Sequence, residues 1–229
     1  IRGFNLTMPN KNKIVELLDD LSPEAQLIGA VNTVLNDNGK LIGYNTDGYG
    51  FMQSVRDAGH DITGKNITVM GVGGASMAIC AQSALDGAAS VHIFARRTSR
   101  YWNRTQKFAE NLSAKTGCQV CLFDNDDHTA LRDSIAQSYL LINATSVGMV
   151  PDIDDTIIKD TSLFHPELVV ADVVYEPQET RLLREAKAAG CQTFNGMYML
   201  LHQGAKAFQI WTGQEMPVSV IKEKYFSVK

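Results

Sequence analysis

Near the start of the chain, the spacing of the hydrophobic residues switches several times between that of a strand and that of a helix. Phe4, Leu6 and Met8 alternate with polar or small residues, which predicts a strand. Apolar residues spaced for one helical face follow, so a helix is expected over residues 11–21. The next expected elements are a hairpin with Asn-Asp-Asn-Gly at its turn, formed by Val31–Leu35 and Lys40–Tyr44, and a helix over Asp47–Ala58.

From Asn66 onward, apolar runs alternate regularly with helical patterns. The expected strands are Ile67–Val72, Val91–Phe94, Val120–Phe123, Leu140–Asn143, Val169–Val174 and Cys191–Phe194. The expected helices between them are Ala75–Gly87, Tyr101–Lys115, His128–Gln137 and Thr180–Ala189. Apolar strands that alternate with helices are typical of an α/β fold whose parallel sheet is covered on both faces. A largely apolar last helix, Met197–Trp211, is expected to be buried.

Composition narrows the class of protein further. The chain has 229 residues, of which 45% are hydrophobic, and its formal charge is 21 − 25 = −4. This length and apolar content suit a globular protein of one to two domains rather than a disordered chain. A mildly acidic balance argues against a nucleic-acid partner, and no apolar run is long enough to span a membrane.

The four cysteines do not form a recognisable metal motif. Cys118 and Cys121 have the C-x-x-C spacing, but no second C-x-x-C or H-x₃-H pair completes a zinc site. Residues 119–123 also look like a strand rather than the start of a helix, as a thioredoxin-type motif would require. We therefore expect buried thiols, no metal and a reducing cytoplasmic location.

A glycine-rich loop follows the first strand of the alternating region and opens a helix. Glycines at such a turn allow backbone N–H groups to approach a pyrophosphate at the positive end of the helix. Serine takes the place of the third glycine of the G-x-G-x-x-G pattern. The strand–turn–helix context nevertheless predicts a dinucleotide site made by Gly71, Val72, Gly73, Gly74, Ala75 and Ser76.

The end of the next strand indicates which dinucleotide is bound. NAD-binding folds place an acidic residue here to hold the ribose hydroxyls, but this chain has Ala95, Arg96, Arg97 and Thr98. Guanidinium and hydroxyl groups suit a 2′-phosphate, so NADP is favoured while NAD stays open.

Several further motifs occur in a fixed order along the chain. They are N-L-T-M-P-N-K at Asn5–Lys11, G-A-V-N-T at Gly29–Thr33, N-T-D-G at Asn45–Gly48, G-V-G-G-A-S at Gly71–Ser76, N-A-T-S-V-G-M at Asn143–Met149, D-V-V-Y-E-P at Asp172–Pro177 and G-M-Y-M-L-L-H-Q-G-A at Gly196–Ala205. With these motifs the chain resembles the shikimate dehydrogenase family, including its quinate/shikimate branch, over nearly its whole length.

The resemblance implies a two-lobed α/β fold. A Rossmann-like, doubly wound parallel sheet, residues 47–195, would be inserted into an α/β substrate-binding domain. That domain would comprise residues 1–46 and the returning C-terminal helices, residues 196–229. Family members carry a preceding segment whose serines bind the substrate carboxylate, so Ile1 is expected to lie inside a longer natural protein.

The resemblance also implies site residues. Lys11 and Asp47 would be the catalytic pair, with Lys11 as general acid/base. The substrate would be held by Thr7, Asn32, Tyr175 and Gln203. The adenosine side of the cofactor would contact the glycine loop and residues 95–98, and the nicotinamide side would lie near Ser146, Val173 and Gly196.

The implied activity is reversible hydride transfer between NADP(H) and shikimate or 3-dehydroshikimate, in the chorismate pathway of aromatic amino acid biosynthesis. The implied assembly is a monomer or homodimer. A quinate dehydrogenase using NAD or NADP is an alternative, although Ser146 stands where that branch often has lysine. A catalytically silent cofactor-binding module is a second alternative. Related folate and tRNA-linked dehydrogenases fit less well, because they do not account for Lys11, Asp47 and Gln203.

Overall fold

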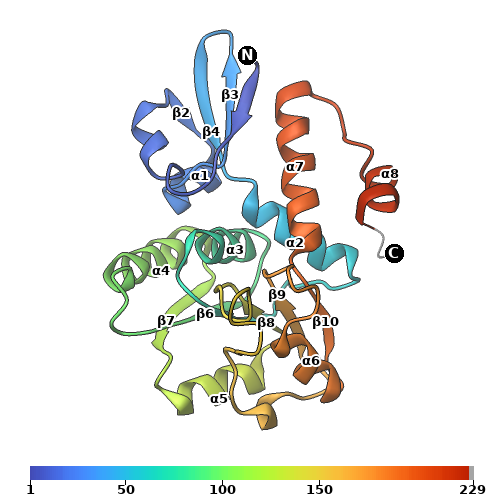
Figure 1. The fold of residues 1–229 in the computed structure, drawn as a ribbon. Coiled ribbons are helices and arrows are strands. Elements are labelled where there is room, and N and C mark those ends of the chain that lie inside the picture. The colour runs from blue at the N-terminus through green and yellow to red at the C-terminus, as the bar shows by residue number, and fades with distance from the viewer. Residues whose placement is uncertain (227–229) are drawn as a thin grey trace.

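The computed structural model describes residues 1–226, which form two lobes, each with its own sheet (Figure 1). The larger lobe has six strands and the smaller has four. The predicted mixed α/β class with a parallel sheet is confirmed. Helix α2 (Asp47–Asp57) runs between the lobes, and helix α7 (Met197–Thr212) packs beside it on the way back to the small sheet.

The large sheet is parallel throughout and has the order β10-β9-β8-β5-β6-β7. Its strands are β5 (Asn66–Met70), β6 (Ser90–Ala95), β7 (Gln119–Asp124), β8 (Leu140–Asn143), β9 (Val169–Asp172) and β10 (Gln192–Phe194). The chain moves outward from β5 to β7 and then returns to β8 on the other side of β5. The direction of winding therefore reverses between β5 and β8, where open α/β sheets bind ligands.

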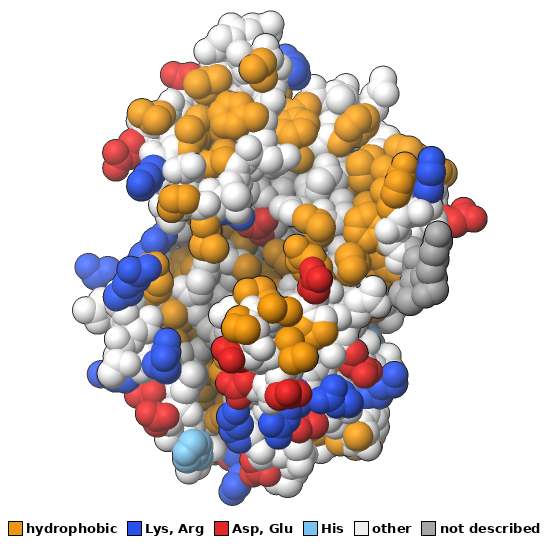
Figure 2. Space-filling view, in the orientation of Figure 1, with side chains coloured by type: hydrophobic (Ala, Val, Ile, Leu, Met, Phe, Trp, Pro, Cys, Tyr) orange, Lys and Arg blue, Asp and Glu red, His pale blue; other side chains and the backbone are white. Residues whose placement is uncertain are grey.

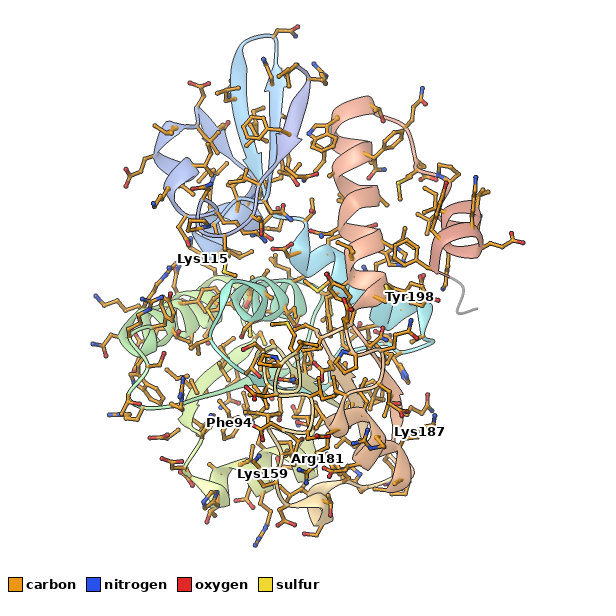
Figure 3. All side chains as sticks on the ribbon, viewed as in Figure 1. Phe94, Lys115, Lys159, Arg181, Lys187 and Tyr198 are labelled. Atoms are coloured by element: carbon orange, nitrogen blue, oxygen red, sulfur yellow. The ribbon has the colours of Figure 1, made fainter. Side chains whose placement is uncertain are left out.

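Alternation along the strands divides the large core into two layers. Ile67 and Val69 of β5 face one side, while Met70 joins the cluster on the other. Helices α2, α3 (Gly74–Leu85) and α4 (Trp102–Thr116) supply the first layer. Helices α5 (His128–Gln137) and α6 (Arg181–Ala188), with the 3₁₀ turn η2 (Thr161–Leu163), supply the second, where Phe94 is completely buried (Figure 3).

The small sheet has the order β1-β3-β4-β2 and is mostly antiparallel. Its strands are β1 (Gly3–Asn5), β2 (Asp20–Leu21), β3 (Thr33–Asp37) and β4 (Lys40–Tyr44). The predicted hairpin is present as β3 and β4. Its turn has positive φ at Asn38 (53°) and Gly39 (99°), as a tight hairpin turn requires.

The prediction of a helix over residues 11–21 is wrong. The structure has a 3₁₀ turn η1 (Lys13–Leu17) followed by β2. Asp19 prevents the helix from continuing, because its backbone and side chain bind a strand instead. Its N–H donates to the Leu41 carbonyl, and its carboxylate accepts from the Leu41 N–H. A helix that the sequence analysis did not predict, α1 (Pro23–Ile28), begins at the Ser22 cap and ends at Gly29 in the left-handed region.

Helix α7 is less buried than its composition predicted. Only Leu201, His202 and Ala207 are buried in it. Its far end is tied to the small sheet, because the Trp211 indole N–H donates to the Val34 carbonyl at 2.9 Å. Helix α8 (Val218–Ile221) and the π-helical turn η3 (Lys222–Phe226) follow, and η3 lies beside Tyr198 at the start of α7 (Figure 3).

Among residues 1–226, none of the helices combines the length and the apolarity needed to cross a membrane.

Close packing of α2 against α7 depends on Gly50. A Cβ atom at this position would lie 2.7 Å from both the Gln203 nitrogen and the Met199 carbonyl oxygen, which are backbone atoms. The two helices can approach this closely only because residue 50 has no side chain.

We predict that Gly50→Ala lowers the free energy of unfolding by about 1–3 kcal/mol, because the added methyl group must push α7 away. Gly204→Ala is the matched control on α7, where a Cβ would meet nothing within 4 Å. This control should gain about 0.5–1 kcal/mol from helix propensity alone. Urea unfolding of both variants measures the difference, and equal effects would contradict the packing argument.

A buried carboxylate joins the ends of the two strands β8 and β9. Asp172 is fully buried, and its Oδ1 accepts from Asn143 Nδ2 (3.0 Å) and the Val174 N–H (2.9 Å). Its Oδ2 accepts from Thr180 Oγ1 at 2.8 Å. Burial raises the pKa of Asp172 above its ordinary value, although these three donors act in the opposite direction.

Asp172→Asn should therefore fold and gain stability relative to the wild type as pH rises. Because the folded-state pKa is raised, the native protein takes up a proton that the unfolded chain does not. The wild type is thus most favoured at low pH and loses stability as pH rises through that pKa. Asp172→Ala, which strands the three donors, should cost about 2–5 kcal/mol. Urea unfolding from acid to neutral pH tests both expectations; a difference between wild type and Asn variant that does not change with pH would contradict them.

Candidate functional site

A charged pair with little exposure to solvent lies where the two lobes meet. Lys11 Nζ donates to Asp47 Oδ2 at 2.6 Å, and their side chains are only 19% and 7% exposed. Lys11 comes from the turn after β1, and Asp47 is the first residue of α2. An ammonium group has three donors, so this one leaves Lys11 able to donate to an oxygen of a ligand as well.

The second oxygen of Asp47 is held by Asn32. Asn32 Nδ2 donates to Asp47 Oδ1 at 2.8 Å, and the same amide group lies 3.1 Å from Gln203 Oε1 on α7. Asn32 therefore links the small sheet, the start of α2 and α7 at one point. The four residues Lys11, Asn32, Asp47 and Gln203, distant in sequence, form one polar cluster.

Backbone and side-chain contacts fix the orientation of this cluster. The Thr46 N–H donates to Asn32 Oδ1 at 2.9 Å, which determines which end of the Asn32 amide faces Asp47. The Asp47 N–H donates to Asn45 Oδ1, and Asn45 Nδ2 donates to the Ala30 carbonyl. The chain around Asp47 is thus held on both sides.

Two of the predicted substrate residues stay apart from the cluster. Thr7 and Tyr175 are exposed, and among residues 1–226 no hydrogen bond joins their side chains to Lys11, Asn32 or Asp47. Thr7 lies just before Lys11 in the same turn, and Tyr175 follows β9. The space-filling view is hollowed between the two lobes (Figure 2).

The glycine loop lies at the point where the sheet reverses its winding. Gly71 has φ +111°, and a Cβ there would lie 2.8 Å from Thr145 Cγ2 and 2.9 Å from the Ala144 carbonyl oxygen. By contrast, a Cβ at Gly73 or Gly74 would meet nothing within 4 Å. No side chain caps α3, so the N–H groups of its first turn face this open space. The arrangement suits an anion such as a pyrophosphate.

The serine at the position of the third glycine of the G-x-G-x-x-G pattern has a structural explanation. Ser76 is fully buried, and its Oγ donates to the Gly71 carbonyl at 2.6 Å. The hydroxyl closes the turn from inside, beneath the open surface formed by the glycines and by the partly exposed Val72 and Ala75. Ser76 therefore supports the loop in this protein rather than interrupting its pattern.

The basic loop after β6 is exposed beside the glycine loop. Ala95 ends β6, and Arg96, Arg97 and Thr98 follow with their side chains in solvent. The Arg97 guanidinium stacks over the Trp102 ring, 4.7 Å from its centroid. Figure 2 shows Lys and Arg side chains gathered on the side of the molecule where α4 lies. These groups could bind a phosphate next to the adenosine position.

The predicted nicotinamide residues come together at the ends of β8, β9 and β10. The Val173 N–H donates to the Asn143 carbonyl at 2.9 Å, and Ser146 lies exposed in the loop after β8. Gly196 packs so closely that a Cβ would lie 2.1 Å from the Val173 carbonyl oxygen. Only glycine allows α7 to begin there.

Some residues of the site had no predicted role. Asn45, Thr46, Asn143 and Asp172 belong to the quoted motifs, so the signal was present, but their function is to orient their neighbours. Such a role becomes visible only when the partners are placed in space.

Within residues 1–226, no group of three or more His, Cys, Asp and Glu side chains is placed to hold a metal ion. Burial raises the pKa of the Cys80 thiol to about 12 and that of Cys118 to about 11, so both are held as thiols.

Comparison with known proteins gives consistent matches. Residues 1–34 match the shikimate dehydrogenase substrate binding domain, and residues 196–224 match the shikimate 5′-dehydrogenase C-terminal domain. The shikimate dehydrogenase (NADP(+)) of Listeria innocua serovar 6a is 52% identical over 226 residues, covering 99% of this chain and 77% of that protein. The quinate/shikimate dehydrogenase of Escherichia coli O139:H28 is 42% identical over 97% of this chain and 77% of its own length.

A solved structure also agrees with the fold. Shikimate 5-dehydrogenase from Listeria monocytogenes, in complex with shikimate and NAD, superimposes with a TM-score of 0.95 at 52% identity. The match covers 97% of this chain and 77% of that one. With this identity over nearly all of its length, the chain belongs to the shikimate dehydrogenase family.

Proposed function

We propose that this protein is an NADP-dependent shikimate dehydrogenase that interconverts shikimate and 3-dehydroshikimate. The observation that carries the proposal is the Lys11–Asp47 pair, joined to Asn32 and Gln203 at the junction of the lobes. Family membership supplies the substrate class, and the cluster supplies the groups that the reaction needs.

The proton chemistry can be assigned to this chain's own residues. NADP, when bound, accepts or returns the hydride. During ketone reduction, the Lys11 ammonium group gives a proton to the carbonyl oxygen and becomes a neutral amine; during alcohol oxidation, the neutral amine takes the proton that leaves the hydroxyl oxygen. Asp47 Oδ2 holds Lys11 in position, and Asn32 prevents the carboxylate from turning away. Asn32 and Gln203, with Thr7 and Tyr175, would bind the ring hydroxyls.

The cofactor residues fit a phosphorylated dinucleotide. The open glycine loop at α3 accommodates the pyrophosphate, and the exposed Arg96, Arg97 and Thr98 suit the 2′-phosphate. Ser146, Val173 and Gly196 would border the nicotinamide. NAD remains an alternative cofactor, as the Listeria monocytogenes complex with NAD illustrates for a relative.

The domain boundaries, location and assembly form part of the same proposal. Residues 1–46 and 196–229 would form the substrate lobe, and 47–195 the cofactor lobe; positions 227–229 lie outside the described residues. We place the enzyme in the cytoplasm, as a monomer or homodimer.

One assay separates the proposed function from its alternatives. Protein is mixed with NADP or NAD and with shikimate or quinate, and the absorbance of reduced nicotinamide is followed. Turnover of shikimate with NADP supports the proposal. Preference for quinate points to the quinate branch, and a thermal shift with NADP without any turnover points to a silent binding module.

Lys11→Ala should lower kcat by about 10²- to 10⁴-fold, the usual contribution of general acid–base catalysis. The affinity for NADP, measured by titration, should not change, because Lys11 Nζ pairs with Asp47 and, among the described residues, makes no hydrogen bond to the glycine loop. Lys13→Ala is the matched control, since Lys13 is an exposed lysine two residues further along. Turnover of Lys11→Ala within a few-fold of the wild type would overturn the assignment.

Replacing both Arg96 and Arg97 by Ala should raise KM for NADP by about 10- to 100-fold, as expected for lost charge-assisted hydrogen bonds to phosphate. KM for NAD, which lacks the 2′-phosphate, should change little. Lys115→Ala controls for the loss of positive charge, because Lys115 lies at the opposite end of α4 (Figure 3). An equal rise of KM for both cofactors would show that these arginines do not bind the 2′-phosphate.

A further inference from the structure

A histidine next to the proposed substrate residue Gln203 makes a polar contact outside the cluster. His202 is 5% exposed, and its Nε2 lies 2.9 Å from Asp57 Oδ2. The other oxygen of Asp57 accepts from Gln53 Nε2 at 2.9 Å, so the carboxylate is held from both sides. None of these three residues takes part in the proposed chemistry.

The contact joins the same two helices that meet at the cluster. Helix α2 carries Asp47 at its first residue and Asp57 at its last. Helix α7 carries His202 and Gln203 in sequence, about 100° apart around the helix axis. One residue thus faces the far end of α2, while the next faces Asn32 and the Lys11–Asp47 pair.

Two other contacts between α2 and α7 lie near Gln203, one at Gly50 and one at Lys206. The close approach at Gly50 sets how near the two helices lie, but a glycine offers no side chain to interlock with α7. The anchor of α7 at Trp211 lies more than two helical turns beyond Gln203. Lys206 Nζ lies 5.0 Å from the centroid of the Tyr49 ring, a contact without a fixed hydrogen-bond direction. Among the described residues, the His202–Asp57 contact is the side-chain hydrogen bond that joins α2 to α7.

We propose that His202 and Asp57 are a positioning pair that fixes the rotation of α7 and so holds Gln203 in place for the substrate. This inference rests on the proposed function, in which Gln203 binds the substrate. Neither residue touches the reacting atoms. Their effect is transmitted through the backbone of α7 to the Gln203 amide, which lies 3.1 Å from Asn32.

The chemistry of the pair indicates which variant should preserve it. Burial lowers the pKa of His202, although Asp57 acts in the opposite direction, so the neutral imidazole donates its Nε2 hydrogen to the carboxylate. A glutamine amide can place a neutral N–H donor at a similar distance from the backbone. The pair also borders a cavity of about 470 Å³ between α2, α7 and α8. If His202 were shortened, its space would join this cavity, and no neighbouring side chain would take over its contact with Asp57.

The test compares His202→Ala, His202→Gln and Asp57→Ala in the full chain. We expect His202→Ala and Asp57→Ala to raise KM for shikimate by about 5- to 30-fold, with kcat and KM for NADP little changed. His202→Gln should restore most of the substrate affinity. Lys206→Ala is the matched control, because Lys206 lies on the same helix but contacts the Tyr49 ring and Gln209 rather than Asp57.

A double-mutant cycle distinguishes positioning from general destabilisation. If His202 acts through Gln203, His202→Ala should have no further effect on KM in the Gln203→Ala background. Additive effects, or a KM for His202→Ala no higher than that of Lys206→Ala, would overturn the proposal.

A readout that needs no turnover separates this inference from the proposed function. The side-chain amide NMR signals of Asn32 and Gln203 should shift in His202→Ala and Asp57→Ala, and shift less in Lys206→Ala. Unchanged amide signals would overturn the positioning role whatever the enzyme does. Absence of wild-type turnover with shikimate, together with shifted signals, would instead overturn the proposed function.

Discussion

The Asp47 carboxylate is the group on which the arrangement of the lobes depends. It is almost completely buried, and a charge in such a position is tolerated only when it is paired and hydrogen-bonded. One oxygen is satisfied by Lys11 from the turn after β1, and the other by Asn32, which directly precedes β3 of the small sheet. Removing either partner would leave a buried charge partly unmet, so the stability of this junction and its chemistry depend on the same contacts.

Helices α2 and α7 carry that junction into the rest of the molecule. Asp47 lies at the first turn of α2, while Gly50 lets α7 approach until backbone atoms are nearly in contact. Gln203 can therefore reach Asn32 from a segment that is 171 residues away in sequence. The last contact of α2, at Asp57, completes the connection with α7 through His202.

On the side of the glycine loop, buried polar side chains likewise hold the backbone in position. Ser76 and Asp172 are both buried: Ser76 holds the loop after β5, and Asp172 links the end of β9 to β8, the strand beside β5. The Ser76 hydrogen bond closes the glycine loop from inside, and the N–H groups at the start of α3 face open space. Polar groups inside the protein thus keep the binding surface in shape without occupying it.

Much of this could be predicted from the sequence alone. The alternation of apolar runs and helical patterns determined the parallel sheet, because buried strands must be apolar on both faces. The glycine loop and the arginines predicted a dinucleotide site, because glycine permits the tight turn and guanidinium groups bind phosphate. Resemblance in the ordered motifs indicated Lys11 and Asp47 as partners. The local pattern predicted the wrong structure at residues 11–21. The spacing of apolar residues there suits a helix, but hydrogen bonds between Asp19 and the distant Leu41 hold the end of this segment against the small sheet.

Only the tertiary structure decided how these pieces meet. The joining of Asn32 to Gln203, the interior position of Ser76 and the pairing of His202 with Asp57 are contacts between side chains far apart in sequence or facing inward. Periodicity records which face of an element is buried, but not which atoms it meets there. The residue types of the candidate site were therefore determined by the sequence, whereas their distances and orientations were set by the packing of the two lobes and of α2 against α7.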